Sequence, residues 1–359
     1  MVNKTFSLLA VLSAAIILSS CHKEEDPSVK SYTVPTTYTF SNADFTKSTQ
    51  LTKMTVELDA YLKKANVGST LVPLDQTVVD NMFANTHSPF ADAALNSTGI
   101  SIASLTADAS LYKSLADSVL IFNTGAAASP GTGGFVPRNA NKIVVGPTGL
   151  EYGQAYVKGT MGALFFKEVV QLLTNVKTIA ATDTIAAQAA WDAAFGYLSV
   201  PVDYDTSVTY ADTDPNRPLL WGDYLAERGK SIQADGIIFN AFLKGRAAIG
   251  GYDVDVRDEQ ADIILDKWEQ LAAAAALYYV TSPTASASVG NYGSQLHALS
   301  EGFGFIAALQ YRSSHSKLAA ADFATLTRIL HADFYVLLNQ PGFTDLVTAQ
   351  NILKTTYGL

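Results

Sequence analysis

Apolar residues recur at helical spacing along almost the whole chain, most clearly over residues 291–312. In that stretch Leu296, Leu299, Phe303 and Ile306 fall on one face of a helix. The chain has no convincing strand–helix–strand units and no glycine-rich phosphate or dinucleotide loop. The sequence therefore predicts an all-α fold, a helical bundle of about ten helices.

The same periodicity sets the expected helices along the chain. They cover about 49–68, 75–84, 107–122, 150–174, 183–198, 218–230, 231–249, 256–280, 289–312, 319–338 and 344–356. Asp183 and Asp255 are candidate N-caps. Before the helices, aromatic and polar residues alternate over 31–45, which predicts a short extended arm or one or two strands packed on the helical body. Residues 124–149 are rich in Gly, Pro, Ser and Ala and predict a long loop, with or without a small hairpin.

A weak internal echo relates two of the expected helices. Tyr-Gly pairs stand at 152 and 292, and Gly162 and Gly302 follow at the same offset of 140 residues. If the echo is real, the chain consists of two related helical halves, about 31–200 and 201–359.

The first residues are typical of a targeting segment. A positive start at Lys4 and an apolar run over 6–18 lead to Leu-Ser-Ser-Cys, which ends at Cys21, the only cysteine in the chain. This pattern resembles a bacterial lipoprotein signal, in which the peptide is cut before a cysteine that is then lipidated. We expect residues 1–20 to be the signal peptide, 21–30 a tether and 31–359 the helical domain. The alternative is an ordinary secretory signal with a chance cysteine.

The charge of the chain limits its partners. The formal net charge is −9, and it becomes −10 when Lys4 leaves with the signal peptide. Such an acidic surface argues against binding to nucleic acid or anionic lipid. The charged run at 22–26 resembles the surface-export tag of Bacteroidota lipoproteins, and a solvated tether is the alternative.

His297 and Glu301 are the most suggestive pair in the chain. Four residues apart on a helix, they share one face, where they can ligate one cation or act as a base with its orienting partner. Further ligands must come from other helices, and Glu151 and Asp192 are the candidates. The alternative interpretation is a His–Glu hydrogen bond inside a tightly packed core.

A second group of residues suggests a ligand pocket. Trp191 and Tyr197 belong to an aromatic stretch that can line a cavity between helices. Gly293, with two more glycines in the same predicted helix, indicates the close approach of another backbone or of a ligand. Aromatic residues in such a stretch equally form ordinary core.

Four stretches carry a family resemblance: EYGQAYVKGTMGA (151–163), WDAAFGYLSVP (191–201), LLWGDY (219–224) and HALSEGFGFI (297–306). They resemble an uncharacterised family of Bacteroidota lipoproteins that is similar to the imelysin-like, iron-regulated proteins. The resemblance implies an all-helical fold of two related bundles and a role in iron acquisition at the envelope. The imelysin signature Gly-x-His-x-x-Glu is longer here, with Gly293, His297 and Glu301 each separated by three residues.

Taken with the resemblance, these features predict a lipid-anchored protein of the outer membrane, exposed at the cell surface or else facing the periplasm. Its expected role is that of an accessory binding protein in the uptake of iron or another divalent metal. The expected partners are the membrane, through the anchor, and an outer-membrane uptake receptor. One alternative is an imelysin-type metallopeptidase with Glu301 as the base beside a metal on His297. Another is a surface lipoprotein that binds glycan or protein.

Overall fold

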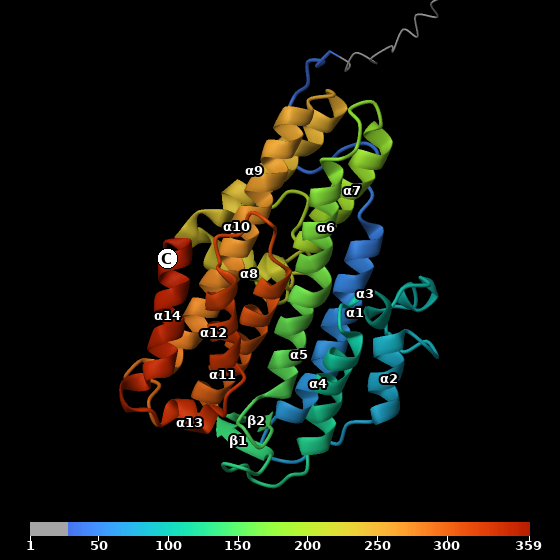
Figure 1. The fold of residues 1–359 in the computed structure, drawn as a ribbon. Coiled ribbons are helices and arrows are strands. Elements are labelled where there is room, and N and C mark those ends of the chain that lie inside the picture. Colours follow the sequence, from blue (N-terminus) through green and yellow to red (C-terminus); the bar gives the residue numbers. More distant parts are fainter. Residues whose placement is uncertain (1–27) are drawn as a thin grey trace, which may run out of the picture.

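The computed structural model describes residues 28–359 and confirms the all-α prediction. The helices are α1 (Thr46–Lys63), α2 (Gln76–Ala84), α3 (Ile102–Leu105), α4 (Ala109–Phe122), α5 (Tyr152–Thr160), α6 (Lys167–Val176), α7 (Thr184–Leu198), α8 (Trp221–Arg228), α9 (Ala234–Gly250), α10 (Val254–Thr281), α11 (Tyr292–Ala308), α12 (Ala320–Leu330), α13 (Phe334–Leu338) and α14 (Thr344–Tyr357). The strands are β1 (Gly134–Arg138) and β2 (Asn141–Val145). The long helices lie side by side in an elongated bundle, with the β-hairpin at one end (Figure 1).

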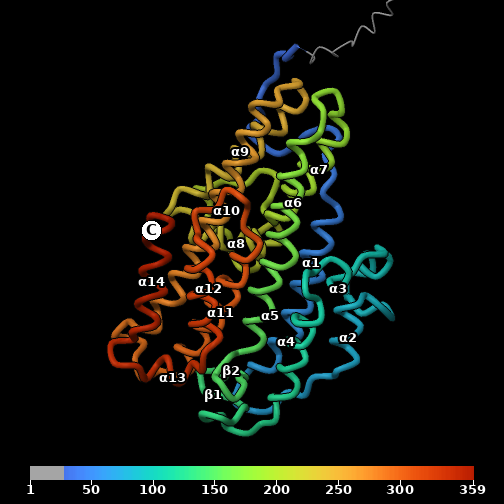
Figure 2. The backbone as a smooth tube through the Cα atoms, viewed as in Figure 1, coloured from blue at the N-terminus to red at the C-terminus, as the bar shows by residue number. Residues whose placement is uncertain are grey.

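A single run of helix passes through the middle of the bundle. α5 continues through a π-helical turn, Met161–Phe166, directly into α6 (Figure 2). A π turn shifts the backbone hydrogen-bond register, and outside donors complete the bonding here. The Trp221 indole donates to the Met161 carbonyl at 2.8 Å, and the Ala107 N–H donates to the Ala163 carbonyl at 3.0 Å. The helix and its neighbours are therefore bonded to each other at this turn.

α5 and α11 run parallel to one another and touch through glycines. A Cβ added to Gly304 would lie 2.3 Å from the Cβ of Lys158 and 2.7 Å from the amide nitrogen of Gly159. Farther along the same pair of helices, a Cβ on Gly162 would lie 2.4 Å from the Cα of Ala308. No side chain fits between the two backbones at these points. The two helices are the ones that begin with the Tyr-Gly pairs, and the division into two related halves stays a prediction.

Residues 124–149 contain a small hairpin, one of the two alternatives that their sequence left open. β1 and β2 pair antiparallel, with Gly134 opposite Val145. Residues 142–145 of β2 are all buried, so both faces of this strand are covered, while β1 lies against α11. There a Cβ on Gly293 would lie 2.1 Å from the Pro137 carbonyl oxygen. The glycines of this helix predicted the close approach of another backbone or of a ligand. At Gly293 it is the backbone of β1.

One predicted cap is confirmed and one is wrong. The Asp183 side chain accepts a hydrogen bond from the Ala186 N–H at 3.1 Å and begins α7 as expected. Asp255 does not cap the long helix. α10 starts earlier, because Asp253 accepts from the Val256 N–H at 3.1 Å.

The arm before α1 is extended and contains no strand from residue 28 onward. Its Tyr38 is buried and stacks on Phe195 of α7, with the ring centroids 3.6 Å apart. The arm therefore contributes an aromatic side chain to the core, as the alternating pattern predicted.

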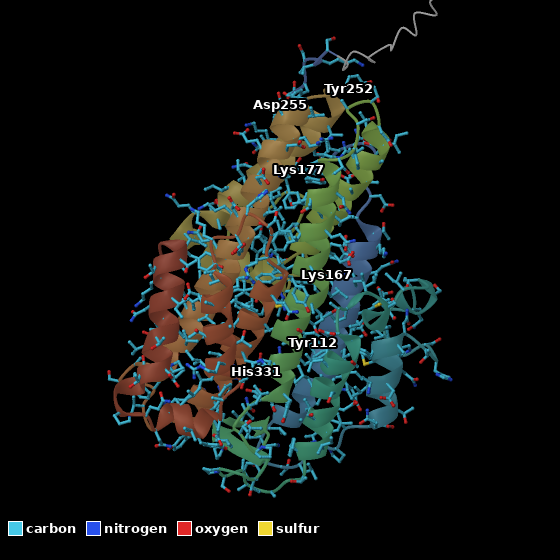
Figure 3. All side chains as sticks on the ribbon, in the orientation of Figure 1. Tyr112, Lys167, Lys177, Tyr252, Asp255 and His331 are labelled. Carbon is cyan, nitrogen blue, oxygen red and sulfur yellow. The ribbon has the colours of Figure 1, made fainter. Side chains whose placement is uncertain are left out.

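The arm is also fastened at the turn between α9 and α10. The Lys30 N–H donates to the Gly251 carbonyl at 2.8 Å, and the Lys30 ammonium lies 4.1 Å from the ring centroid of Tyr252. Tyr252 and Asp255 mark this end of the bundle (Figure 3). The described chain thus enters the fold at the end opposite the hairpin (Figure 1).

Candidate functional site: a buried His–carboxylate cluster

The parallel contact between α5 and α11 brings three of the four expected ligands together. His297 Nδ1 lies 2.7 Å from Glu151 Oε2, and His297 Nε2 lies 3.8 Å from Glu301 Oε1. The side chain of Glu151 is 1% exposed, that of Glu301 9% and that of His297 16%. The imidazole therefore stands between two nearly buried carboxylates.

Local structure fixes the position of Glu151. It immediately precedes α5, and a carboxylate at a helix N-terminus is favoured by the helix dipole. Its N–H donates to the Ser300 hydroxyl of α11 at 2.8 Å, and its Oε1 accepts from the Asn66 amide at 2.8 Å. These bonds hold the second oxygen, Oε2, toward His297.

The hydrogen bond to Glu151 sets the tautomer of His297. An ionised carboxylate can only accept, so Nδ1 carries the hydrogen. In a neutral imidazole the lone pair is then on Nε2, on the side of Glu301. This is the carboxylate–histidine arrangement that orients metal-ligating imidazoles.

A lysine that the sequence analysis did not single out completes the cluster. The Lys158 ammonium is 3.6 Å from Glu301 Oε1 and 4.9 Å from the ring centroid of Tyr224. Burial acts to lower the pKa of Lys158, but attraction by Glu301 and then by Asp59 outweighs it, so the pKa is raised. Lys158 lies two turns after Glu151 on the same helical face. Their spacing of seven residues was the sequence signal that could have identified Lys158.

Two tyrosines close the far side of Lys158. The hydroxyls of Tyr224 and Tyr279 are 3.1 Å apart, and burial raises the pKa of both above the ordinary value. Both groups therefore stay neutral hydroxyls. With a neutral imidazole, the cluster holds the carboxylates of Glu151 and Glu301 against the single ammonium of Lys158. This excess of negative charge in a poorly solvated place favours a further cation.

The donors of the cluster fit a metal ion only in part. Residues 28–359 contain no group of three or more His, Cys, Asp or Glu side chains placed to hold one. Two protein donors nevertheless come close to the required spacing. Ligand atoms about 2.0–2.2 Å from a tetrahedral ion are roughly 3.3 to 3.6 Å apart, and His297 Nε2 and Glu301 Oε1 are slightly farther apart, at 3.8 Å. The donors fit an ion that keeps its remaining ligands from water or from a chelator.

Asp192, the fourth expected ligand, is not brought to this cluster. It lies on α7, where its carboxylate takes hydrogen bonds from Arg246 Nε at 2.7 Å and from the Tyr38 hydroxyl at 2.7 Å. Both sides of this ion pair are nearly fully buried. Asp192 links the arm, α7 and α9. Its pairing with Arg246, 54 residues away, could not be predicted from helical periodicity.

Trp191 and Tyr197, two of the expected pocket residues, lie on α7, whereas His297 and Gly293 lie on α11. Trp191 is fully buried and its indole donates to the Phe242 carbonyl at 2.9 Å. Tyr197 packs edge-on against Phe165, with centroids 5.7 Å apart. Gly293 meets β1. Cys21 and the signal peptide lie outside the described residues.

None of the helices between residues 28 and 359 combines the length and apolar character needed to cross a bilayer. No curated protein and no solved structure is found to match the chain. One family model does match, over residues 35–355, from the arm to the last helix. That match covers nearly all of the described residues, including every side chain of the cluster. The chain therefore belongs to the family described as a domain of unknown function, DUF4856.

Proposed function

We propose that this protein is a lipid-anchored binding protein of the cell envelope that captures a metal ion, iron or another divalent cation, at His297 and Glu301. The observation that carries the proposal is the pair of distances around the imidazole. Glu151 orients the ring through Nδ1 at 2.7 Å, while Nε2 faces a second carboxylate at 3.8 Å. The ion would be cargo, in keeping with the imelysin-like resemblance and with a surface receptor as partner.

Burial supports capture of an ion over peptide cleavage. A metallopeptidase must admit a polypeptide beside its metal and its base. Here the side chains of His297 and Glu301 are only 16% and 9% exposed, so the cluster admits a small ion more readily than a chain. Glu301 is also paired with Lys158, which opposes its use as a general base.

Elemental analysis tests the proposal. The purified protein is incubated with iron, zinc or calcium, washed extensively and compared with the variants His297→Ala and His315→Ala. His315 is a matched control, because it also pairs with a carboxylate, Asp262 at 3.1 Å, but is exposed. We expect near-stoichiometric metal in wild type and in His315→Ala and none in His297→Ala. Equal metal contents in all three would sink the proposal.

A second variant separates metal capture from a packing role. The Lys158 ammonium competes with any cation for Glu301. Lys158→Met therefore strengthens metal binding if the site is a cation site, and this is measured by competition with a chelator. If the cluster only holds the helices together, the same change leaves metal binding absent and lowers stability.

The proposed anchor rests on Cys21 and the apolar run before it. Labelled palmitate should be incorporated into the full chain expressed in a bacterium and not into Cys21→Ser, which should also leave the membrane fraction. Incorporation into both would point to another attachment.

A further inference from the structure

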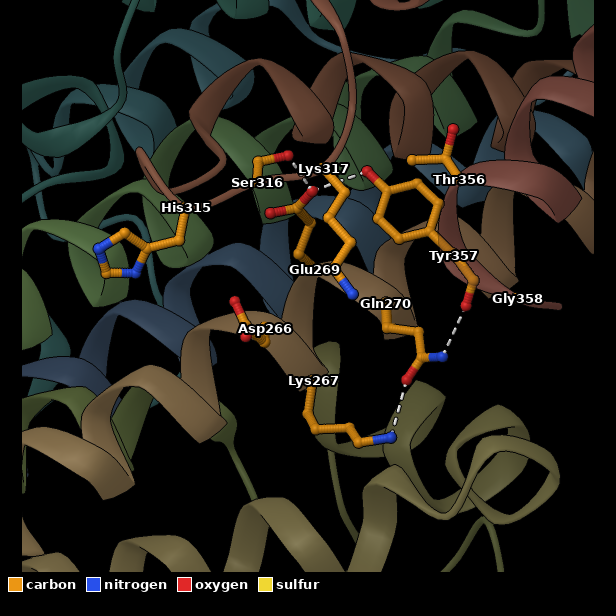
Figure 4. A pocket seen from close by; sticks show the side chains of 10 residues that line it. All are labelled: Asp266, Lys267, Glu269, Gln270, His315, Ser316, Lys317, Thr356, Tyr357 and Gly358. Atoms are coloured by element: carbon orange, nitrogen blue, oxygen red, sulfur yellow. Dashed lines mark hydrogen bonds between the residues drawn. The ribbon is translucent and has the colours of Figure 1, made fainter.

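A second polar pocket lies between α10, α14 and the segment 313–319, and it shares no lining residue with the His297 cluster. Its volume is about 400 Å³, within the range of about 300–1,000 Å³ that small-molecule sites occupy. Figure 4 shows Glu269 at its wall, between Ser316 and Tyr357 on one side and Gln270 on the other. The pocket is therefore large enough for a ligand of several heavy atoms.

Glu269 is a buried carboxylate, and only one of its two oxygens accepts hydrogen bonds from the described residues. The residue is 2% exposed. Its Oε1 accepts from the Tyr357 hydroxyl at 2.7 Å and also from the Ser316 hydroxyl. Its Oε2 has no hydrogen bond or ion pair with any residue from 28 to 359 and is turned away from both hydroxyls, toward the side of His315 (Figure 4).

Oε2 is not one of the fully buried polar atoms that lack a partner, so it remains accessible from the pocket. A carboxylate largely removed from water loses much of its solvation, and a charged donor that reaches it is therefore favourable. Burial raises the pKa of Glu269, although the hydrogen bonds from Ser316 and Tyr357 and the attraction of Arg312 act to lower it. A bound ammonium group would supply both a positive charge and hydrogen-bond donors to Oε2.

The opposite charge lines the same pocket. Lys317 is exposed and forms no ion pair within the described residues. Lys267 contributes a second ammonium, which donates to Gln270 Oε1 at 2.9 Å (Figure 4). The lining thus offers an acceptor at Glu269 and positive charge at Lys317, a pattern complementary to a molecule with an ammonium group and a carboxylate.

We infer that this pocket binds a small zwitterion of the amino-acid class, with its ammonium group on Glu269 Oε2 and its carboxylate at Lys317. The inference does not depend on metal capture, because the two sites have no residue in common.

Calorimetric titration of the purified full chain tests it, with each of the twenty L-amino acids as probe. For the strongest binder, the matched 2-hydroxy acid, which lacks the ammonium group, is titrated as well. We expect at least one amino acid to bind and its hydroxy acid to bind at least about tenfold more weakly, since a hydrogen bond to a charged group contributes about 1.5–3 kcal/mol.

The variants sharpen the result. Glu269→Gln keeps an acceptor for Ser316 and Tyr357 but removes the charge, and we expect affinity to fall by about tenfold or more. Lys317→Ala, on the exposed rim, should weaken binding without affecting the fold. Lys244→Ala, an exposed lysine on α9, is the control and should bind as wild type does. The inference is overturned if no amino acid binds at millimolar concentration. It is also overturned if folded Glu269→Gln and Lys317→Ala both bind as wild type does.

Discussion

His297 Nδ1 and Glu151 Oε2 lie 2.7 Å apart although 146 residues separate them in the chain. The contact exists because α5 and α11 run parallel and so close together that only glycine fits at their contact points. The start of α5 therefore lies against the second turn of α11. The packing of the two helices thus creates the site. Variants can nevertheless change the chemistry of the site or the packing separately.

Glu151→Gln tests the orienting role. The amide oxygen can still accept from His297 and the side chain fills the same volume, but the amide NH2 then replaces the oxygen that accepted from Asn66, and the charge that stabilises the ring is lost. Loss of such an outer-shell carboxylate typically weakens metal affinity about 10–100-fold. Competition with a chelator measures the affinity. Glu168→Gln on α6, which removes the same charge from a carboxylate paired with Lys167, is the control. Equal affinities for all three proteins would contradict the role.

Gly304→Ala tests the close helix contact. The new Cβ would meet Lys158 Cβ at 2.3 Å and the Gly159 amide at 2.7 Å, so we expect a loss of stability of about 1–3 kcal/mol. Gly302→Ala in the same helix is the matched control. Its Cβ would make ordinary contacts at 3.4 Å and beyond, and the gain in helix propensity is up to about 1 kcal/mol. Urea unfolding should therefore move in opposite directions for the two variants, and equal shifts would refute the packing argument.

The buried pair between Asp192 and Arg246 should matter for stability and not for metal. Asp192→Ala leaves a buried guanidinium without its partner, a change that costs about 3–5 kcal/mol. The exposed pair between Lys244 and Glu259, 3.5 Å apart, supplies the comparison, and Lys244→Ala should change stability little. If Asp192→Ala instead kept its stability and lost metal, Asp192 would be a ligand after all.

The raised pKa of Glu269 makes a pH-dependent prediction. Burial raises this pKa above the ordinary value of 4.5, so the folded protein binds a proton more tightly than the unfolded chain does. Stability attributable to this group therefore falls as pH rises from 4.5 through the folded pKa, and it is greatest below that window. Glu269→Gln removes the dependence. The unfolding free energies of wild type and Glu269→Gln, measured from pH 4 to 7, should be similar at low pH. At pH 7 the variant should be the more stable of the two relative to that starting point. A difference that stays constant over this range would contradict the raised pKa.

Helical periodicity predicted most of the elements but not their contacts. The single helix expected over 319–338 is wrong, because the chain forms two helices there, α12 and α13, and α3 was not expected. The helix expected over 289–312 is α11, Tyr292–Ala308, because a cap at Asn291 and a continuous apolar stripe act locally. The helix expected over 150–174 is also present, yet its π turn was not foreseen. That turn depends on the Trp221 indole and on the contact between Gly162 and Ala308, which come from distant parts of the chain.

The candidate site was also predictable only where it depends on local spacing. His297 and Glu301 share a helix face by their spacing alone, and the structure places them together. Glu151 could be proposed only through the internal echo, and Asp192 was proposed without any pairing information. Its partners, Arg246 and Tyr38, lie on other elements. Lys158 and Glu269 were missed because a charged residue on an amphipathic helix looks solvated until its neighbours are known.

The fastening of the arm at the turn between α9 and α10 gives the molecule a direction. The described chain begins at that end of the bundle, so any group joined ahead of residue 28, whether a lipid or an affinity tag on a sensor surface, is tethered from there (Figure 1). Glu151 follows the hairpin and lies at the opposite end. Attachment through the amino terminus therefore presents the hairpin and the Glu151 side of the His297 cluster outward, where a metal donor or acceptor would meet the proposed site.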